Sequence, residues 1–304
     1  ARAWMRMIDA LPLERALRQH APAMTDRDFS HVRRVVVKIG TGVLTDSKGR
    51  FDAVHFARLT ADLADVARTH QLIVVSSGAV ALGVERLGLP GKPKEIPGKQ
   101  AAAAVGQGLL MHRYESALGP AGFAVAQVLL THDDFSNRTR YLNARRALEC
   151  LFESKALPII NENDTVSVDE IKLGDNDNLA GLVAGLVGAD LLVILSDVDG
   201  LYTADPRHDP AAKKLEVVER VTPEIESLAG GSGTKVGTGG MATKVRAARR
   251  AAEAGTPTVV APGKQIGALL KLLAGEPIGT LFLADETPLP SRKRWLAHAL
   301  KPKG

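Results

Sequence analysis

The sequence 35-VVVKIGTGVL-44 joins a run of β-branched residues to a glycine-rich turn. Such a run is typical of a strand that is buried on both faces of a parallel sheet. Lys38 interrupts it, and burying an unpaired ammonium group is costly, so this side chain must reach water, a carboxylate or an anion. The stretch therefore predicts a central strand of an α/β sheet with a cation near its carboxyl end. The alternative is a lysine that extends along a sheet edge to water.

The same pattern of short apolar runs followed by alanine-rich helical periods continues along the chain. Strands are predicted at 35–39, 72–76, 125–130, 158–161, 191–196, 258–261 and 280–283, and helices at 54–70, 99–118, 137–155, 178–188, 241–254 and 265–274. This alternation predicts an α/β fold, a three-layer αβα sandwich with a mainly parallel central sheet. Since no repeat or linker interrupts it, we expect one domain over residues 31–290, an N-terminal extension of unknown role at 1–30 and a basic tail at 291–304.

Composition narrows the possible classes of function. The net charge of +5 comes from the two ends, which leaves the central 256 residues at about −3 and argues against a dedicated nucleic-acid binder. No run of eighteen apolar residues occurs, so no membrane span is predicted. Cys150 is the only cysteine, which excludes an intrachain disulfide and fits a cytoplasmic location. Its Ala- and Leu-rich surroundings predict that it packs in the core.

Two further motifs follow predicted strands. The segment 72-LIVVSSGAV-80 ends a strand in two hydroxyls and a glycine before a helix, which indicates an anion site or simple N-capping by Ser77. The segments 161-NEND-164 and 174-GDNDN-178 gather amides and carboxylates at a strand end and before a helix. Asx-turns account for two or three of these residues but not for all nine, so a binding site for a small polar molecule is favoured.

The segment 237-GTGGMATK-244 opens an arginine-rich helix. It matches the dinucleotide fingerprint only weakly, because it lies late in the chain without a clear strand before it. Lys244, about one turn into the helix, favours a phosphate cradle with a second cation over a bare flexible loop. Neither a P-loop nor a protein-kinase catalytic loop is present, and the histidines are scattered, so no metal ligand is assigned.

Five segments, in this order and spacing, resemble the amino-acid kinase superfamily and, within it, the branch that phosphorylates L-glutamate. They are VVKIGTGVL, VVSSGAVALG, IINENDTVSVDEIKLGDNDNLA, LSDVDGLYTADPR and GTGGMATKVRAA, and the resemblance covers residues 32–295. The INEND and GDNDN segments are the part specific to glutamate. The resemblance implies the amino-acid kinase fold and ATP-dependent phosphorylation of the glutamate side-chain carboxylate to L-glutamyl 5-phosphate, the first step of proline biosynthesis, with ATP and Mg²⁺ as cofactors.

The resemblance also assigns roles to residues of this chain. Lys38 and Lys244 are expected to be catalytic, with Asp177 orienting them. Glutamate is expected to contact Ser77, Asp164 and Asn176. The expected nucleotide contacts are Lys38, Ser196, Asp197, Thr238, Gly239, Gly240, Met241, Ala242, Thr243 and Lys244.

Assembly and regulation follow only from the resemblance. Many relatives carry a C-terminal PUA domain, and this sequence ends soon after PSRKRWLAHAL, so that domain is expected to be absent. A homo-oligomer, either dimer or tetramer, is expected, with proline as a feedback inhibitor and no membrane or nucleic-acid partner. Two alternatives stay open. One is a sister kinase that acts on N-acetylglutamate, aspartate, carbamate or uridylate, and the other is a non-catalytic sensor on the same fold, against which the two lysines argue.

Overall fold

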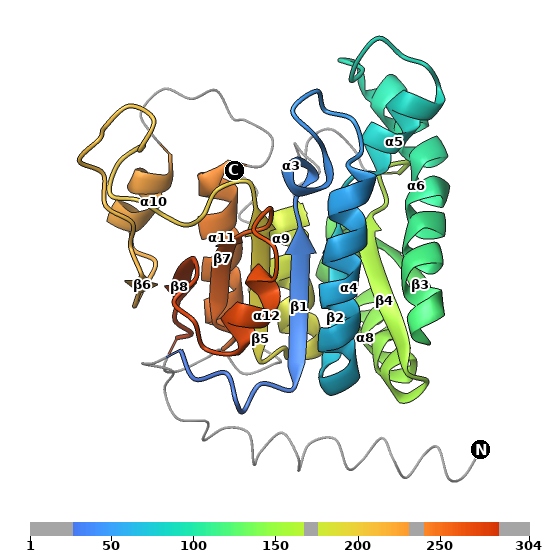
Figure 1. The fold of residues 1–304 in the computed structure, drawn as a ribbon. Helices are drawn as coiled ribbons and strands as arrows, with labels where there is room; N and C mark the ends of the chain where they lie inside the picture. Colours follow the sequence, from blue (N-terminus) through green and yellow to red (C-terminus); the bar gives the residue numbers. More distant parts are fainter. Residues whose placement is uncertain (1–26, 167–175, 231–239, 286–304) are drawn as a thin grey trace, which may run out of the picture.

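The computed structural model describes residues 27–166, 176–230 and 240–285, which form a central sheet between two layers of helices (Figure 1). The predicted extension at 1–30 lies mostly outside these residues, and the predicted tail at 291–304 lies wholly outside them. The predicted three-layer α/β sandwich is therefore confirmed for the described part of the chain.

The sheet has eight strands in the order β3-β4-β2-β1-β5-β7-β8-β6. Strands β3 to β7 of this order run parallel, while β8 is antiparallel to β7 and β6 is parallel to β8. The bounds are β1 Arg34–Ile39, β2 Gln71–Ser76, β3 Ala124–Leu130, β4 Ala156–Glu162, β5 Leu191–Ser196, β6 Val217–Val218, β7 Thr258–Pro262 and β8 Thr280–Phe282.

Helices connect these strands. They are α3 Thr41–Leu44, α4 Ala53–Thr69, α5 Ala79–Arg86, α6 Ile96–Leu118, α7 His132–Ser136, α8 Arg138–Glu153, α9 Asn176–Val187, α10 Pro223–Ala229, α11 Met241–Glu253 and α12 Ala268–Leu273, with a 3₁₀ turn at Gly119–Ala121. None of the helices in the described ranges is long and apolar enough to cross a membrane.

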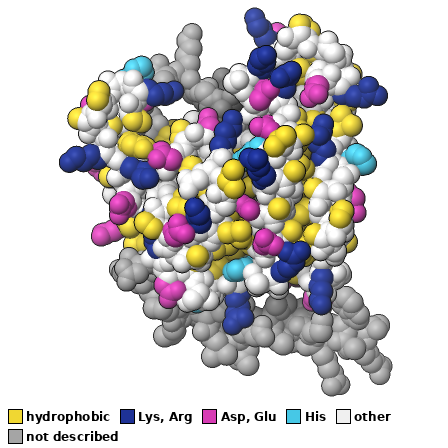
Figure 2. All heavy atoms as spheres, in the orientation of Figure 1, with side chains coloured by type: hydrophobic (Ala, Val, Ile, Leu, Met, Phe, Trp, Pro, Cys, Tyr) yellow, Lys and Arg dark blue, Asp and Glu magenta, His cyan; other side chains and the backbone are white. Residues whose placement is uncertain are grey.

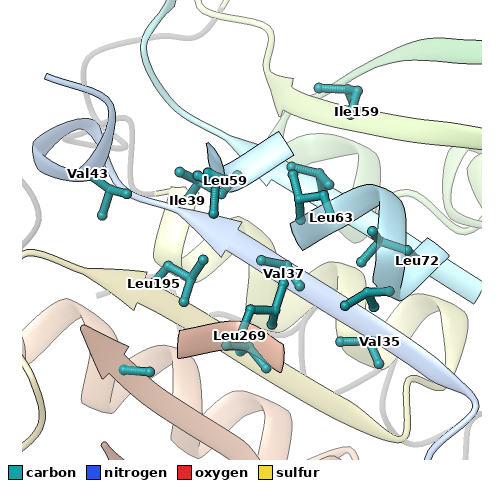
Figure 3. Close-up of a cluster of buried hydrophobic side chains, with 14 of the residues drawn as sticks. Val35, Val37, Ile39, Val43, Leu59, Leu63, Leu72, Ile159, Leu195 and Leu269 are labelled. Carbon is teal, nitrogen blue, oxygen red and sulfur yellow. The ribbon is translucent and has the colours of Figure 1, made fainter. Parts of the chain in front are cut away.

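Strand β1 contributes to both hydrophobic cores. Val35, Val37 and Ile39 pack with α4, α6 and α12 on one face of the sheet, as Figure 3 shows for part of this cluster. Val36 joins the core formed with α8, α9 and α11 on the other face. Because successive side chains of a strand alternate between faces, Lys38 points to the same side as Val36. The alternation thus directs the ammonium group toward α9 and α11.

Several predicted elements differ from the structure. Helix α9 begins at Asn176, two residues before its predicted start, and α12 is shorter than the predicted 265–274. Helices α5 and α10 and strand β6 were not among the predicted elements. Cys150 is exposed, so its predicted core position is wrong. Cys150 lies on the solvent-facing side of α8, whereas Leu148 is the residue of this helix that is fully buried.

Charged side chains of both signs intermingle over the face of the molecule seen in Figure 2. Lysine and arginine do not gather there into one continuous basic surface.

Candidate active site

The carboxyl ends of β1, β2, β4 and β5 meet at one edge of the sheet, because these strands are parallel neighbours. Ligands of open α/β sheets bind at this edge. Residues from four of the segments singled out in the sequence lie there, at the ends of the strands or at the starts of the helices that follow.

Lys38 and Lys244 share one carboxylate. Lys38 Nζ lies 2.5 Å from Asp177 Oδ1, and Lys244 Nζ lies 3.2 Å from Asp177 Oδ2. The Thr243 hydroxyl donates to the same Oδ2 atom at 2.7 Å. The trio of Lys38, Asp177 and Lys244 therefore joins β1, α9 and α11, and it brings together two cations that are 206 positions apart in the sequence.

Asp177 is fully buried, and burial by itself would raise the pKa of its carboxyl group. The two lysines and the hydrogen bond from Thr243 outweigh burial, so the pKa lies below its ordinary value. Asp177 is thus ionised at neutral pH and holds both ammonium groups in place.

The predicted nucleotide residues lie beside this trio. A Cβ atom added at Gly40 would lie 3.4 Å from Lys38 Nζ, and one at Gly42 would lie 3.3 Å from the Asp197 carboxyl group. The Ser196 hydroxyl donates to Asp197 Oδ1 at 3.0 Å. The turn after β1 therefore passes between Lys38 and the end of β5.

Helix α11 begins at Met241 with Gly240 as its N-cap, and no side chain caps its first turn. The N–H groups at such a helix start favour anions. The predicted nucleotide residues Gly240, Met241, Ala242, Thr243 and Lys244 all belong to this cap and first turn. Thr238 and Gly239, which were also predicted, lie outside the described residues.

A second polar group lies at the end of β2. Asn176 Nδ2 donates to Ser77 Oγ at 2.9 Å and to the Ser76 carbonyl at 3.3 Å. The buried Ser76 hydroxyl lies 2.8 Å from the Tyr114 hydroxyl of α6. Gly78 follows with φ of 109°, a left-handed conformation that glycine adopts without steric cost. This turn presents Ser77 at the sheet edge, so two of the three predicted glutamate contacts lie together.

Helix α6 packs so tightly on α5 that Gly106 has no room for a side chain. A Cβ atom there would lie 1.7 Å from the Ala79 carbonyl oxygen, which belongs to the backbone and has little freedom to move. This contact fixes the neighbouring residue Gln107 next to the polar group at the end of β2.

Asp164, the third predicted glutamate contact, follows β4 and is not hydrogen-bonded to Ser77 or Asn176 in the described structure. Burial and the nearby Glu162 carboxylate raise the pKa of Asp164 to about 6, while Lys92 acts in the opposite direction. Asp164 therefore changes its charge close to physiological pH.

Two residues of this site were not among the predicted contacts. Asn161 is the penultimate residue of β4 and hydrogen-bonds to both Asn176 and Gln107. Asn161 belongs to the NEND segment, which was already singled out in the sequence. Gln107 lies in a helix of mostly small and apolar residues, and no sequence motif marks it.

Within the described ranges, no group of three or more His, Cys, Asp or Glu side chains is placed to hold a metal ion. Mg²⁺ in phosphoryl-transfer sites is bound by one or two carboxylates together with substrate phosphates and water. The Asp197 carboxylate, which follows β5 at the same sheet edge, is a donor of this kind.

Comparison with known sequences matches residues 33–262 to the amino acid kinase family. A glutamate 5-kinase of Myxococcus xanthus (strain DK1622) is 57% identical over 272 residues, covering 90% of this chain and 72% of that protein. A glutamate 5-kinase of Anaeromyxobacter dehalogenans (strain 2CP-C) is 54% identical over 284 residues, covering 92% of this chain and 75% of that protein. The chain thus spans about three quarters of the length of these relatives.

Solved structures share the fold. Carbamate kinase from Giardia lamblia bound to AMP-PNP is 18% identical, with a TM-score of 0.61 over 84% of this chain and 100% of that chain. UMP kinase from Bacillus anthracis is 17% identical, with a TM-score of 0.57 over 84% of this chain and 97% of that chain. At these identities the likeness shows the fold alone.

Proposed function

The chain belongs to the amino acid kinase family and, within it, to the glutamate 5-kinases, and from this membership we propose how its residues divide the work of the reaction. The enzyme transfers the γ-phosphoryl group of ATP to the side-chain carboxylate of L-glutamate and forms L-glutamyl 5-phosphate, as the first step of proline biosynthesis. The observation that carries the assignment of residues is the pairing of Lys38 and Lys244 on one carboxylate.

The site divides into two halves. Lys38, Lys244 and the first turn of α11 receive the phosphates, with Ser196 and Asp197 beside the nucleotide. Ser77, Asn176 and Asp164 receive glutamate, with the Asp164 carboxylate facing the substrate ammonium group. Support for the second half comes from the hydrogen bond between Ser77 and Asn176 and from the partial burial of Asp164 at the same sheet edge.

The reaction needs no general base. A glutamate side chain with a pKa near 4.3 is already ionised at neutral pH, so its oxygen attacks the γ-phosphorus directly while the bond to the β–γ bridging oxygen breaks and ADP leaves. What opposes the step is repulsion between a carboxylate and a polyphosphate. Lys38 and Lys244 offset this repulsion and stabilise the charge on the transferring group, and Asp177 keeps them from moving.

Mg²⁺ is the usual companion of ATP in kinases, and when bound it neutralises phosphate charge. Among the described residues, Asp197, which lies beside the turn that follows Lys38, would hold the ion together with the phosphates.

Trapping of the labile product tests the activity. The purified protein, incubated with Mg-ATP, glutamate and hydroxylamine, is expected to form glutamyl hydroxamate in step with ADP release. Parallel reactions with N-acetylglutamate, aspartate, carbamate and uridylate distinguish sister kinases. ADP release with one of those acceptors but not with glutamate, or the absence of turnover with all of them, would contradict the proposed function.

Asp164→Asn is expected to raise KM for glutamate by roughly ten- to hundredfold, because a hydrogen bond to a charged group contributes about 1.5–3 kcal/mol. In the unaltered enzyme KM for glutamate is expected to rise in the same way as the pH falls through 6, where Asp164 takes up a proton. The variant lacks this pH dependence. Initial rates at varied glutamate between pH 5 and pH 8 provide the measurement.

Although Asp164→Asn is expected to weaken glutamate binding, it is expected to increase the free energy of unfolding. The folded-state pKa of Asp164 is raised, so ionisation costs folding free energy fully above pH 6, and the cost disappears as the pH falls toward the unfolded value near 3.9. Asp164→Asn should therefore unfold at a higher urea concentration than the parent at pH 8, with a smaller difference at pH 5. Asp65→Asn, at an exposed position of α4, is the matched control. A variant that binds glutamate normally would remove Asp164 from the site.

Three further properties stay predictions. A cytoplasmic location, a homo-oligomer and inhibition by proline are proposed from the family, and they await fractionation, light scattering and assays with proline.

A further inference from the structure

Three amide side chains, those of buried Asn161 and Asn176 and half-buried Gln107, form a chain across the proposed glutamate half of the site. Asn161 Nδ2 donates to Gln107 Oε1 at 2.8 Å, and Asn176 Nδ2 donates to Asn161 Oδ1 at 3.0 Å. The chain thus runs from α6 through the end of β4 to the first turn of α9. It continues to Ser77, because Asn176 Nδ2 also donates to the Ser77 hydroxyl.

Backbone groups fix which end of the Asn161 and Asn176 amides is oxygen and which is nitrogen, and Asn161 Nδ2 then fixes the orientation of Gln107. The Glu162 N–H donates to Asn161 at 2.9 Å, so the contacting atom of Asn161 must be its oxygen. The Ser76 carbonyl accepts from Asn176, so that contacting atom must be its nitrogen. Reversing any amide would place two donors or two acceptors face to face. The direction of the whole chain is therefore determined.

This direction leaves one donor and one acceptor without partners among the described residues. Gln107 Nε2 and Asn176 Oδ1 are both buried, and neither has a hydrogen bond. Each such group costs about 1–3 kcal/mol of folding free energy when it stays unpaired. Asn161 and Asn176 are only 2% and 7% exposed, and Gln107 is half-buried, so these amides are held by packing and not free at the surface.

An amino acid carries the complementary groups. Its ammonium group donates and its carboxylates accept, which matches an unpaired amide oxygen and an unpaired amide N–H. We propose that Gln107 is a further specificity-determining residue. Its Nε2 atom donates to a carboxylate oxygen of bound glutamate, and its Oε1 atom holds Asn161 and, through it, Asn176 in the binding orientation. This inference rests on the proposed function of the site.

Gln107→Glu tests the donor separately from the acceptor. The introduced carboxyl group keeps an oxygen for Asn161 but loses the amide N–H. Where it is protonated it can still donate, and once ionised it repels the substrate carboxylate. We expect KM for glutamate to rise at least tenfold at pH 8 and less at pH 6, with KM for ATP and kcat at saturating glutamate within about threefold of the parent.

Gln107→Met, which removes both functions at similar volume, is expected to raise KM for glutamate at every pH. Glu115→Gln, on the exposed face of the same helix, is the control and should leave both KM values unchanged. Glutamyl hydroxamate formation by the parent protein establishes the activity first, so failure of the function and failure of the inference are separate results. A parental KM for glutamate in both Gln107 variants, whether or not their stability falls, would overturn the role of Gln107.

Discussion

Lys38→Met and Lys244→Met are each expected to lower kcat by a hundredfold or more, which corresponds to about 3–4 kcal/mol in the activation free energy. Each lysine supplies a positive charge where negative charge is transferred, and methionine fills the space without that charge. Both variants should fold, because removal of one lysine from the trio leaves the other paired with Asp177.

The measurement is kcat and KM for both substrates, together with urea unfolding to show that the variants are folded. Lys271→Met, at an exposed position on α12, is the control and should keep parental activity. If either active-site variant turns over at close to the parental rate, its lysine takes no part in phosphoryl transfer.

Asp177→Asn is expected to be the most destabilising of the polar substitutions considered, by about 3–5 kcal/mol, because it leaves two buried ammonium groups side by side without their shared carboxylate. Activity should fall as well, since nothing then fixes the distance between the lysines. Added ATP or inorganic phosphate should restore part of the stability, because an anion that binds only the folded state shifts the unfolding equilibrium.

Urea unfolding with and without these anions is the measurement. Asp65→Asn breaks an exposed ion pair with Arg68 and should change the free energy of unfolding by less than about 1 kcal/mol. An Asp177→Asn protein as stable as the parent would show that the trio does not depend on this carboxylate.

Sequence patterns were sufficient for seven of the eight strands described and for the position of Lys38 near the end of β1. The β-branched run at β1, the turn after it and the alternation with helices are local features, and they predicted both the α/β fold and the cation at the strand end. Lys38 was recognisable because a charged side chain within a buried apolar run must reach water, a carboxylate or an anion.

Other features depend on partners distant in the sequence. The Asn- and Asp-rich stretch 174–178 is typical of turns, so the sequence did not indicate that α9 already includes Asn176, Asp177 and Asn178. The direction of β8 cannot be obtained from a short apolar run, because such a run can pair with its neighbour in either parallel or antiparallel orientation. Gln107 is recognisable only when Gly106 brings α6 against α5 and the end of β4 lies opposite, so no local pattern marks it.

Asn176 and Asp177 are consecutive residues in the first turn of α9, and each belongs to a different half of the site. Neighbouring helical residues project about 100° apart, so one short piece of backbone carries the contact for the amino acid and the anchor for both cations. Any displacement of this turn by one substrate is transmitted to the groups that receive the other, without an intervening hinge. Thermodynamic linkage makes such communication mutual, so the factor by which glutamate alters the affinity for nucleotide equals the factor by which nucleotide alters the affinity for glutamate.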